Sequence, residues 1–151
     1  RVETPDFTLV HGTPRRPVEE YLLTVAVFKE VVSQVAVWPL FVGHSHMPLC
    51  FRVRHDWVPT QGQSDVDMIF LEDRQQIQVA AMPYGRVPTA FNPGSVGQPR
   101  DQDSRASCGV YDTETRTFQL VRVQYDIPAV QNKIRLAGLP EFLALRLAFG
   151  Q

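Results

Sequence analysis

Short apolar segments alternate with turn-rich segments through the middle of this chain, and this alternation limits the folds that it can adopt. Four segments have the composition of β-strands, at residues 36–42, 49–54, 66–72 and 77–82. The first and third are almost continuously apolar, which is typical of strands covered on both faces. The pattern therefore predicts a sheet at the centre of the fold.

The segments on either side of this middle predict an α/β fold with mixed and antiparallel strands. Apolar residues at steps of three and four favour helices, and alternation around a turn favours a hairpin. The remaining expected elements are a strand at 7–10, a helix at 17–35, a turn at 92–99, a hairpin at 106–111 and 117–125, and helices at 127–137 and after Pro140.

The composition predicts one domain over residues 1–151. With 44% hydrophobic residues, the chain is able to bury a sizeable core. Its net charge of -1 argues against a nucleic-acid-binding protein that uses a broad basic field. The sequence contains no run of about 18 apolar residues, so it predicts no membrane-spanning helix. Because the sequence lacks a signal peptide, we expect a cytoplasmic protein without a membrane partner. Because it also lacks an initiating Met, we expect the sequence to begin partway through a longer chain.

The histidines are the residues that most suggest chemistry. Of the four, His11, His44 and His46 lie in glycine-flanked loops directly after apolar segments. In open α/β sheets ligands bind beyond the carboxyl ends of the strands, and neutral imidazole is the commonest metal-binding side chain. His55 has charged neighbours and no glycine, so we expect it to be exposed and without function.

We expect His44 and His46, which are separated by one residue, to bind two adjacent metal ions, one histidine to each ion. Gly43 would let the backbone bend close to the ions. Two alternatives stay open: hydrogen-bonded structural histidines, and a mononuclear zinc site that uses the three histidines with Cys50.

Three segments together resemble the calcineurin-like metallophosphoesterases, in particular their small bacterial and archaeal, phosphodiesterase-type branch. Residues 9–14 with 20–22 resemble a metal-ligand segment, residues 40–48 a Gly-His-Ser-His signature, and residues 91–100 an Asn-Pro-Gly-Ser segment. The resemblance is colinear over essentially the whole chain. It implies half or most of a four-layer α/β/β/α sandwich with a mixed or antiparallel sheet.

The resemblance also implies a hydrolase that cleaves a phosphate-ester substrate, a phosphodiester or phosphomonoester. Two divalent ions (Mn, Fe, Zn, Co or Ni) would activate a water molecule for attack on phosphorus. Carried over by position, His11 and His44 would bind one ion and His46 the other, and His44 would also be catalytic. Arg100 would bind the substrate phosphate, unless it forms a structural ion pair.

The chain departs from the family in the metal ligands of its first half. It has no Asp-x-His, Gly-Asp or Asn-His motif, and three neutral imidazoles cannot offset two neighbouring divalent cations. We therefore expect the C-terminal part of a metallophosphoesterase domain, inactive alone, that pairs with a complementary N-terminal half or with itself. The alternative is a non-catalytic interaction module on the same scaffold.

Overall fold

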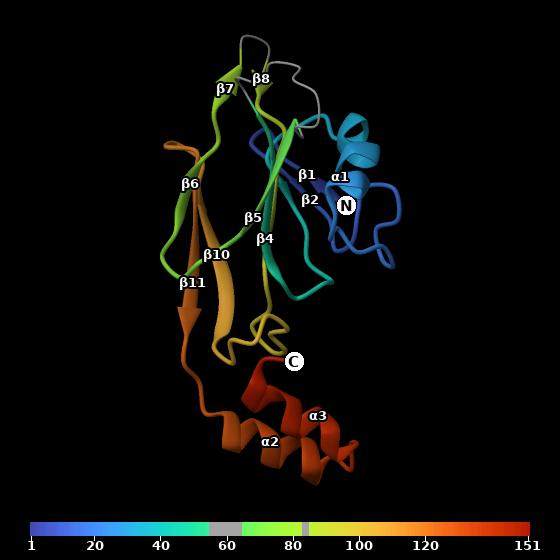
Figure 1. Cartoon of the computed structure of the whole chain (residues 1–151), viewed down its shortest axis with the longest axis vertical. Helices are drawn as coiled ribbons and strands as arrows, with labels where there is room; N and C mark the ends of the chain where they lie inside the picture. The colour runs from blue at the N-terminus through green and yellow to red at the C-terminus, as the bar shows by residue number, and fades with distance from the viewer. Residues whose placement is uncertain (55–64, 83–84) are drawn as a thin grey trace.

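A six-stranded mixed sheet forms the centre of the fold (Figure 1). The computed structural model describes residues 1–54, 65–82 and 85–151, so His55 lies outside the described residues. In spatial order the strands are β1 (Val2–Glu3), β2 (Thr8–Leu9), β3 (Leu40–Phe41), β9 (Thr89–Pro93), β4 (Pro48–Val53) and β5 (Val66–Phe70). Strands β2, β3 and β9 are parallel neighbours, whereas β4 pairs antiparallel with both β9 and β5.

A smaller antiparallel sheet and five short helices complete the described chain. The second sheet contains β10 (Ala106–Asp112), β11 (Thr117–Val123) and β6 (Gln76–Gln78). Strands β7 (Ala81–Met82) and β8 (Gly85–Arg86) form a separate hairpin. The helices are α1 (Val25–Val31), α2 (Ile127–Leu136), α3 (Glu141–Leu145) and two 3-10 turns at Val32–Gln34 and Arg146–Phe149.

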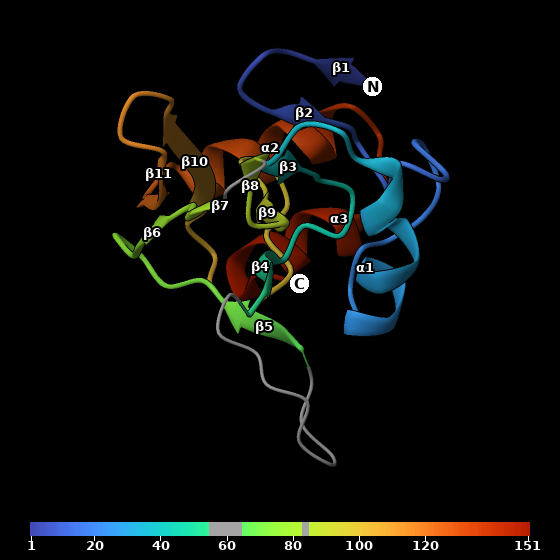
Figure 2. The ribbon, with the colours of Figure 1, turned by 90° about the horizontal axis from the view of Figure 1, so that it is seen from above.

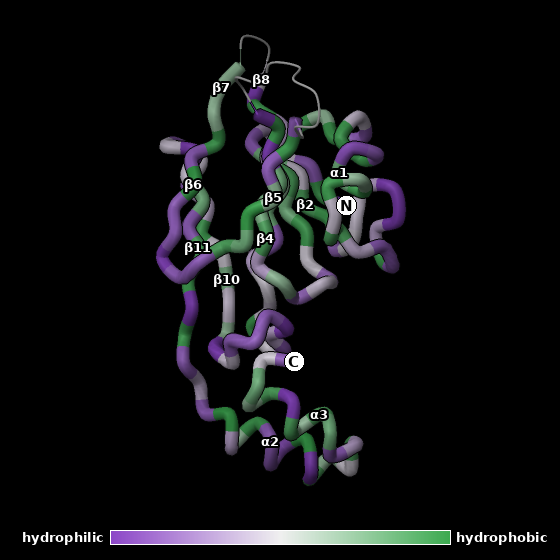
Figure 3. The backbone as a smooth tube through the Cα atoms, viewed as in Figure 1, coloured by the Kyte–Doolittle hydropathy of each residue, from purple (hydrophilic) through white to green (hydrophobic). Residues whose placement is uncertain are grey.

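The elements are layered as α1, the six-stranded sheet and the three-stranded sheet, which Figure 2 shows end-on. Helices α2 and α3 pack on each other beyond one end of the sheets (Figure 1). Hydrophobic and hydrophilic residues alternate along these two helices (Figure 3). The expected α/β fold with mixed and antiparallel strands is confirmed. Within the described residues, no helix has the length and apolar character that a membrane crossing requires.

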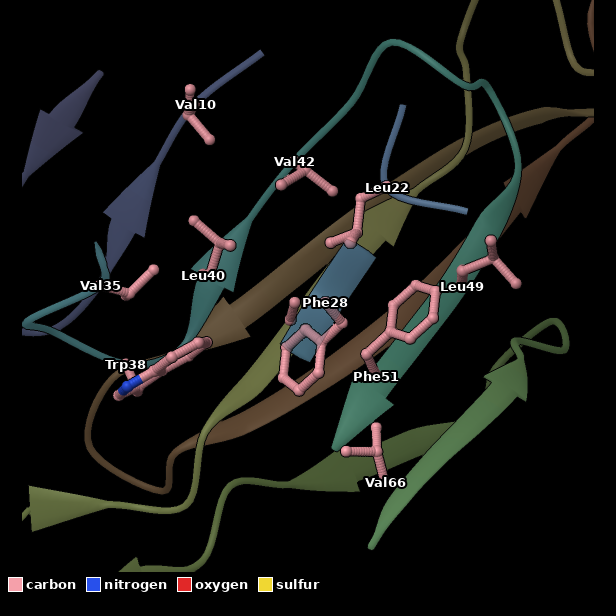
Figure 4. Packing of buried hydrophobic residues seen from close by; sticks show 11 residues of the cluster. Val10, Leu22, Phe28, Val35, Trp38, Leu40, Val42, Leu49, Phe51 and Val66 are labelled. Carbon is pink, nitrogen blue, oxygen red and sulfur yellow. The ribbon is translucent and has the colours of Figure 1, made fainter. Parts of the chain in front are cut away.

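Two apolar clusters hold the layers together. The first joins α1 to the six-stranded sheet, where the Phe28 and Phe51 rings stack with centroids 5.6 Å apart (Figure 4). The second lies between the two sheets, where Phe91 and Phe118 stack at 4.3 Å. Because burying one such side chain contributes about 1.5–3 kcal/mol, the two clusters fix the sheets that carry the histidine loops.

The predicted helix at 17–35 is wrong in its first half, because α1 begins only at Val25, with Thr24 as its N-cap. Residues before it form a turn instead. The Gly12 amide donates to the Pro17 carbonyl at 2.7 Å, and the Glu20 carboxylate accepts hydrogen bonds from Thr13 and Arg15. These contacts with the segment just before it outweigh the helical pattern, whose β-branched residues have low helix propensity.

Other predicted boundaries also shift. The strand expected at 36–42 is shorter than predicted and comprises Leu40–Phe41. The turn expected at 92–99 starts later than predicted, because Asn92 and Pro93 still belong to β9. Strand β9 lies between β3 and β4 in the sheet, and the local sequence pattern did not predict it.

Candidate functional site

The parallel pairing of β2 with β3 brings the first histidine beside the glycine loop. Leu9 is in register with Phe41, and the Val10 amide donates to the Phe41 carbonyl at 3.0 Å. One step further, the Gly43 amide donates to the His11 carbonyl at 2.8 Å. The carboxyl ends of the two strands therefore place both loops at one edge of the sheet, where α/β proteins bind ligands.

The rings of His11 and His44 are in direct contact at this edge. His11 Nε2 lies 3.0 Å from His44 Nδ1, and the ring centroids are 4.7 Å apart. Two nitrogens that each lie about 2.0–2.1 Å from a shared ion are separated by roughly 2.9–3.4 Å. The pair therefore has a nitrogen separation that fits two ligands of one metal ion.

The outer side of His44 is held by the turn that precedes α1. His44 Nε2 lies 3.2 Å from the Glu19 carbonyl oxygen, and the Tyr21 ring stacks on the imidazole at 4.1 Å with an interplanar angle of 11°. A carbonyl oxygen only accepts, so Nε2 carries the proton and the Nδ1 of the neutral ring has a free lone pair. That lone pair faces His11.

Asn92 supports the unusual backbone of the histidine loop. His44 and His46 have φ values of 65° and 61°, which cost non-glycine residues of order 1–3 kcal/mol each. The Asn92 amide group donates to the Gly43 carbonyl and to Ser45 Oγ, both at 2.8 Å, and Asn92 is 2% exposed. These buried hydrogen bonds give Asn92 a structural role in the loop.

His46 points to a different set of partners. Its Nδ1 donates to the Gln98 carbonyl at 2.8 Å, which leaves the Nε2 lone pair of the neutral ring free. Partial burial is the main cause that lowers the pKa of His46, and the positive charge of Arg100 lowers it further. In the described part of the chain, no three His, Cys, Asp or Glu side chains gather as a metal site. The assignment of His46 to a second ion, separate from the pair, stays a prediction.

Arg100 and Cys50, the two remaining candidate site residues, lie in different parts of the fold. The Arg100 guanidinium donates to the Gln98 side-chain carbonyl, with Nε at 3.2 Å, and the Arg100 amide donates to the His46 carbonyl at 3.3 Å. Arg100 therefore lies beside the loop that carries His46. Cys50 is fully buried in the apolar cluster between the sheets, and burial raises the pKa of its thiol to about 12. The zinc site with Cys50 gains no support from this arrangement.

Residue-type patterns did not reveal three of the groups that hold the histidines. The Glu19 and Gln98 carbonyls are backbone groups, which any residue could supply. The Tyr21 contact depends on the turn, where the sequence predicted a helix. The Glu20-Tyr21-Leu22 part of the family resemblance was the one available signal.

Comparisons with known proteins agree with this fold. A metallophosphoesterase from Sphaerobacter thermophilus is similar in structure over 100% of the chain, with a TM-score of 0.85 and 36% identity. The hypothetical protein PH1004 from Pyrococcus horikoshii OT3 has a TM-score of 0.59 and 22% identity over 96% of the chain, which shows similarity of fold. The uncharacterized protein MJ0912 of Methanocaldococcus jannaschii is 33% identical over 144 residues, 93% of the chain. No protein-family model matches the chain.

All three relatives are longer than this chain. It spans 58% of the Sphaerobacter thermophilus chain, 46% of PH1004 and 50% of MJ0912. That it corresponds to their C-terminal part stays a prediction. The chain has the fold of a calcineurin-like metallophosphoesterase and spans only part of the length of the proteins that it resembles.

Proposed function

We propose that this chain supplies His11, His44 and His46 to the two-metal centre of a phosphoesterase. The remaining ligands would come from the part of the domain that the chain does not span. The observation that carries this proposal is the 3.0 Å separation of His11 Nε2 and His44 Nδ1, at the strand ends where the fold binds ligands.

Each residue would have a distinct role at this centre. His11 and His44 would hold one divalent ion and the free Nε2 of His46 the other, with His44 also close to the reacting phosphate. When bound, the two ions would activate water and neutralise charge on the phosphoryl oxygens. Arg100 would exchange its contact with the Gln98 side chain for the phosphate of a substrate ester. Without carboxylate ligands, we expect the isolated chain to be inactive.

The partner would be the complementary part of the same domain. An apolar groove of about 290 Å³ opens between the two sheets, lined chiefly by Phe7, Leu9, Phe41, Tyr111 and Phe118. Leu9 is 47% exposed there. Among the described strands, the seven-residue β10 pairs only with β11, so its other edge is available to a further strand beyond Ser107, whose amide donates to the Ser95 carbonyl. The additional length of the relatives favours this occupant over a second copy.

Complementation tests the proposal. The chain would be mixed with the segment of the Sphaerobacter thermophilus metallophosphoesterase that it does not match, in the presence of Mn²⁺. We expect a one-to-one complex that hydrolyses bis(p-nitrophenyl) phosphate or p-nitrophenyl phosphate, and His44→Ala should abolish hydrolysis without dissociating the complex. A complex that forms but binds no Mn²⁺ and hydrolyses neither ester would refute the enzyme function.

The same groove favours the alternative function, a non-catalytic interaction module. In that case the double variant His44→Ala and His46→Ala would bind the complementary segment as tightly as the unsubstituted chain, and neither complex would contain metal. Self-association of the chain without the segment would instead identify a second copy as the occupant of the groove.

A further inference from the structure

We propose that the turn at residues 16–21 is a positioning element for His44. It would hold the imidazole ring so that Nδ1 faces His11 before any metal binds. This inference rests on the proposed function, because it assigns the turn to a histidine that ligates metal. The family resemblance includes residues 20–22 but assigns the turn no role in orienting His44.

Two contacts from the turn restrict the ring in different ways. Tyr21 stacks almost parallel to the imidazole, with centroids 4.1 Å apart, and this fixes the plane of the ring. The Glu19 carbonyl accepts the Nε2 proton at 3.2 Å, and this fixes the rotation of the ring within that plane. Together they leave one orientation, in which Nδ1 lies 3.0 Å from His11 Nε2.

The turn has its own supports, independent of His44. A Cβ atom on Gly12 would lie 2.8 Å from the Arg16 carbonyl oxygen and 2.9 Å from that of Glu20, so only glycine lets the turn pack this closely. The Glu20 carboxylate binds both Thr13 and Arg15, and the bond with Arg15 is the main cause that lowers the pKa of Glu20. Directly after Tyr21, Leu22 is 1% exposed in the apolar core.

The contacts of the turn with His44 make the two paired histidines differ in whether the nitrogen that would bind metal carries a proton. In the metal-free chain, His11 Nε2 donates to the bare Nδ1 of His44, so the His11 proton lies on the nitrogen that would ligate. His11 must therefore adopt its other tautomer to bind an ion. His44 needs no change, because the Glu19 carbonyl already holds its proton on the opposite nitrogen. Hydrogen bonds of this kind from outer groups raise metal affinity by 10- to 100-fold.

Four proteins test the inference: the unsubstituted chain, Tyr21→Phe, Tyr21→Ala and Val18→Ala. Tyr21→Phe keeps an aromatic ring for stacking, and Val18→Ala is a control in the same turn, at a side chain that is 72% exposed. Long-range ¹H–¹⁵N NMR of the metal-free proteins at pH 8 reports the proton position on each imidazole. The ring-current shifts of the His44 carbon-bound protons report the stacking, and dialysis against Mn²⁺ gives the affinity.

We expect upfield-shifted His44 protons and a single Nε2–H tautomer in the unsubstituted chain, Tyr21→Phe and Val18→Ala. In Tyr21→Ala the ring-current shift should vanish, the Nε2 proton should exchange faster with water, and Mn²⁺ affinity should fall about tenfold. The His46 signals should be identical in all four proteins, which would show that the fold is intact.

Two results separate the failure of this inference from that of the proposed function. If Tyr21→Ala keeps the His44 spectrum and the Mn²⁺ affinity of the unsubstituted chain, the turn does not position His44. If the complex of the unsubstituted chain with the complementary segment binds no Mn²⁺, the proposed function fails, and the NMR comparison alone then decides whether the turn orients the ring.

Discussion

His11 Nε2 and His44 Nδ1 lie 3.0 Å apart although 33 residues separate them in the sequence. Their proximity follows from the parallel pairing of β2 with β3, which ends both strands at the same edge of the sheet. The buried Asn92 comes from β9, the parallel strand next to β3, and donates a hydrogen bond to the Gly43 carbonyl in the loop that follows β3. Three adjacent strands thus contribute to one site, and two substitutions test how it is built.

Replacing Asn92 by Ala should weaken both the fold and metal binding. The substitution removes the donors to the Gly43 carbonyl and Ser45 Oγ, and leaves the positive-φ backbone of the loop without support. We expect a loss of about 1–3 kcal/mol in the free energy of unfolding, measured in urea. Asn132→Ala is the control, on the exposed side of α2, with a change within about 0.5 kcal/mol. Equal stability of the two variants would contradict this role for Asn92.

Replacing Gly12 by Ala should lower metal affinity even though Tyr21 is unchanged. The new Cβ would meet the Arg16 and Glu20 carbonyl oxygens at under 3.0 Å, so the turn that holds His44 has to move. We expect weaker Mn²⁺ binding by dialysis and a changed His44 NMR signal. Gly97→Ala is the matched control, because nothing lies within 4 Å of its added Cβ. Unchanged affinity in Gly12→Ala would mean that the position of the turn does not matter.

The two cysteines should differ in reactivity. Burial raises the pKa of the Cys50 thiol to about 12, whereas Cys108 is partly exposed in β10. Because the thiolate is the reactive form, Ellman's reagent at pH 8 should modify one thiol in the folded chain and two in urea. Mass spectrometry of the peptides should identify Cys108 as the fast site. Rapid modification of Cys50 in the folded chain would contradict its place in the core.

The loop after Arg100 should lose stability in acid. The hydrogen bonds from Arg105 are the main cause that lowers the pKa of Asp103 below 3.8. A carboxyl group with a depressed pKa in the folded state stabilises the protein above its unfolded pKa and loses that contribution as the pH falls through the folded value. Urea unfolding should therefore show falling stability below about pH 4.

Asp103→Asn should flatten this acid dependence, whereas Glu114→Gln, an exposed hairpin residue, should keep it. The amide introduced at position 103 cannot ionise, so this position would have the same charge on either side of pH 4. An equally steep decline in Asp103→Asn would show that other carboxyl groups dominate the acid response.

Local patterns predicted the strands better than the turns between them. The apolar segments of β4 and β5 and the alternation of β10 and β11 are local features, and these elements formed near their predicted positions. The start of α1 was misplaced because Gly12 and Glu20 hold the preceding residues in a turn, through contacts that a helical pattern does not contain.

The candidate site was predictable in part for the same reason. His11, His44 and His46 follow apolar segments, which indicated a common edge of the sheet. The groups that orient their rings are the Glu19 and Gln98 carbonyls and the Tyr21 face. Backbone carbonyls carry no residue-type signal, so their contribution becomes visible only in the folded chain.

Crystals of the chain in complex with the complementary segment, soaked in Mn²⁺, would test the central claim most directly, by the position of the anomalous-scattering peak. The account predicts a peak between the two imidazoles, within about 2.0–2.3 Å of both His11 Nε2 and His44 Nδ1. An ordered loop in which these nitrogens remain hydrogen-bonded to each other, with manganese absent or bound elsewhere, would contradict it.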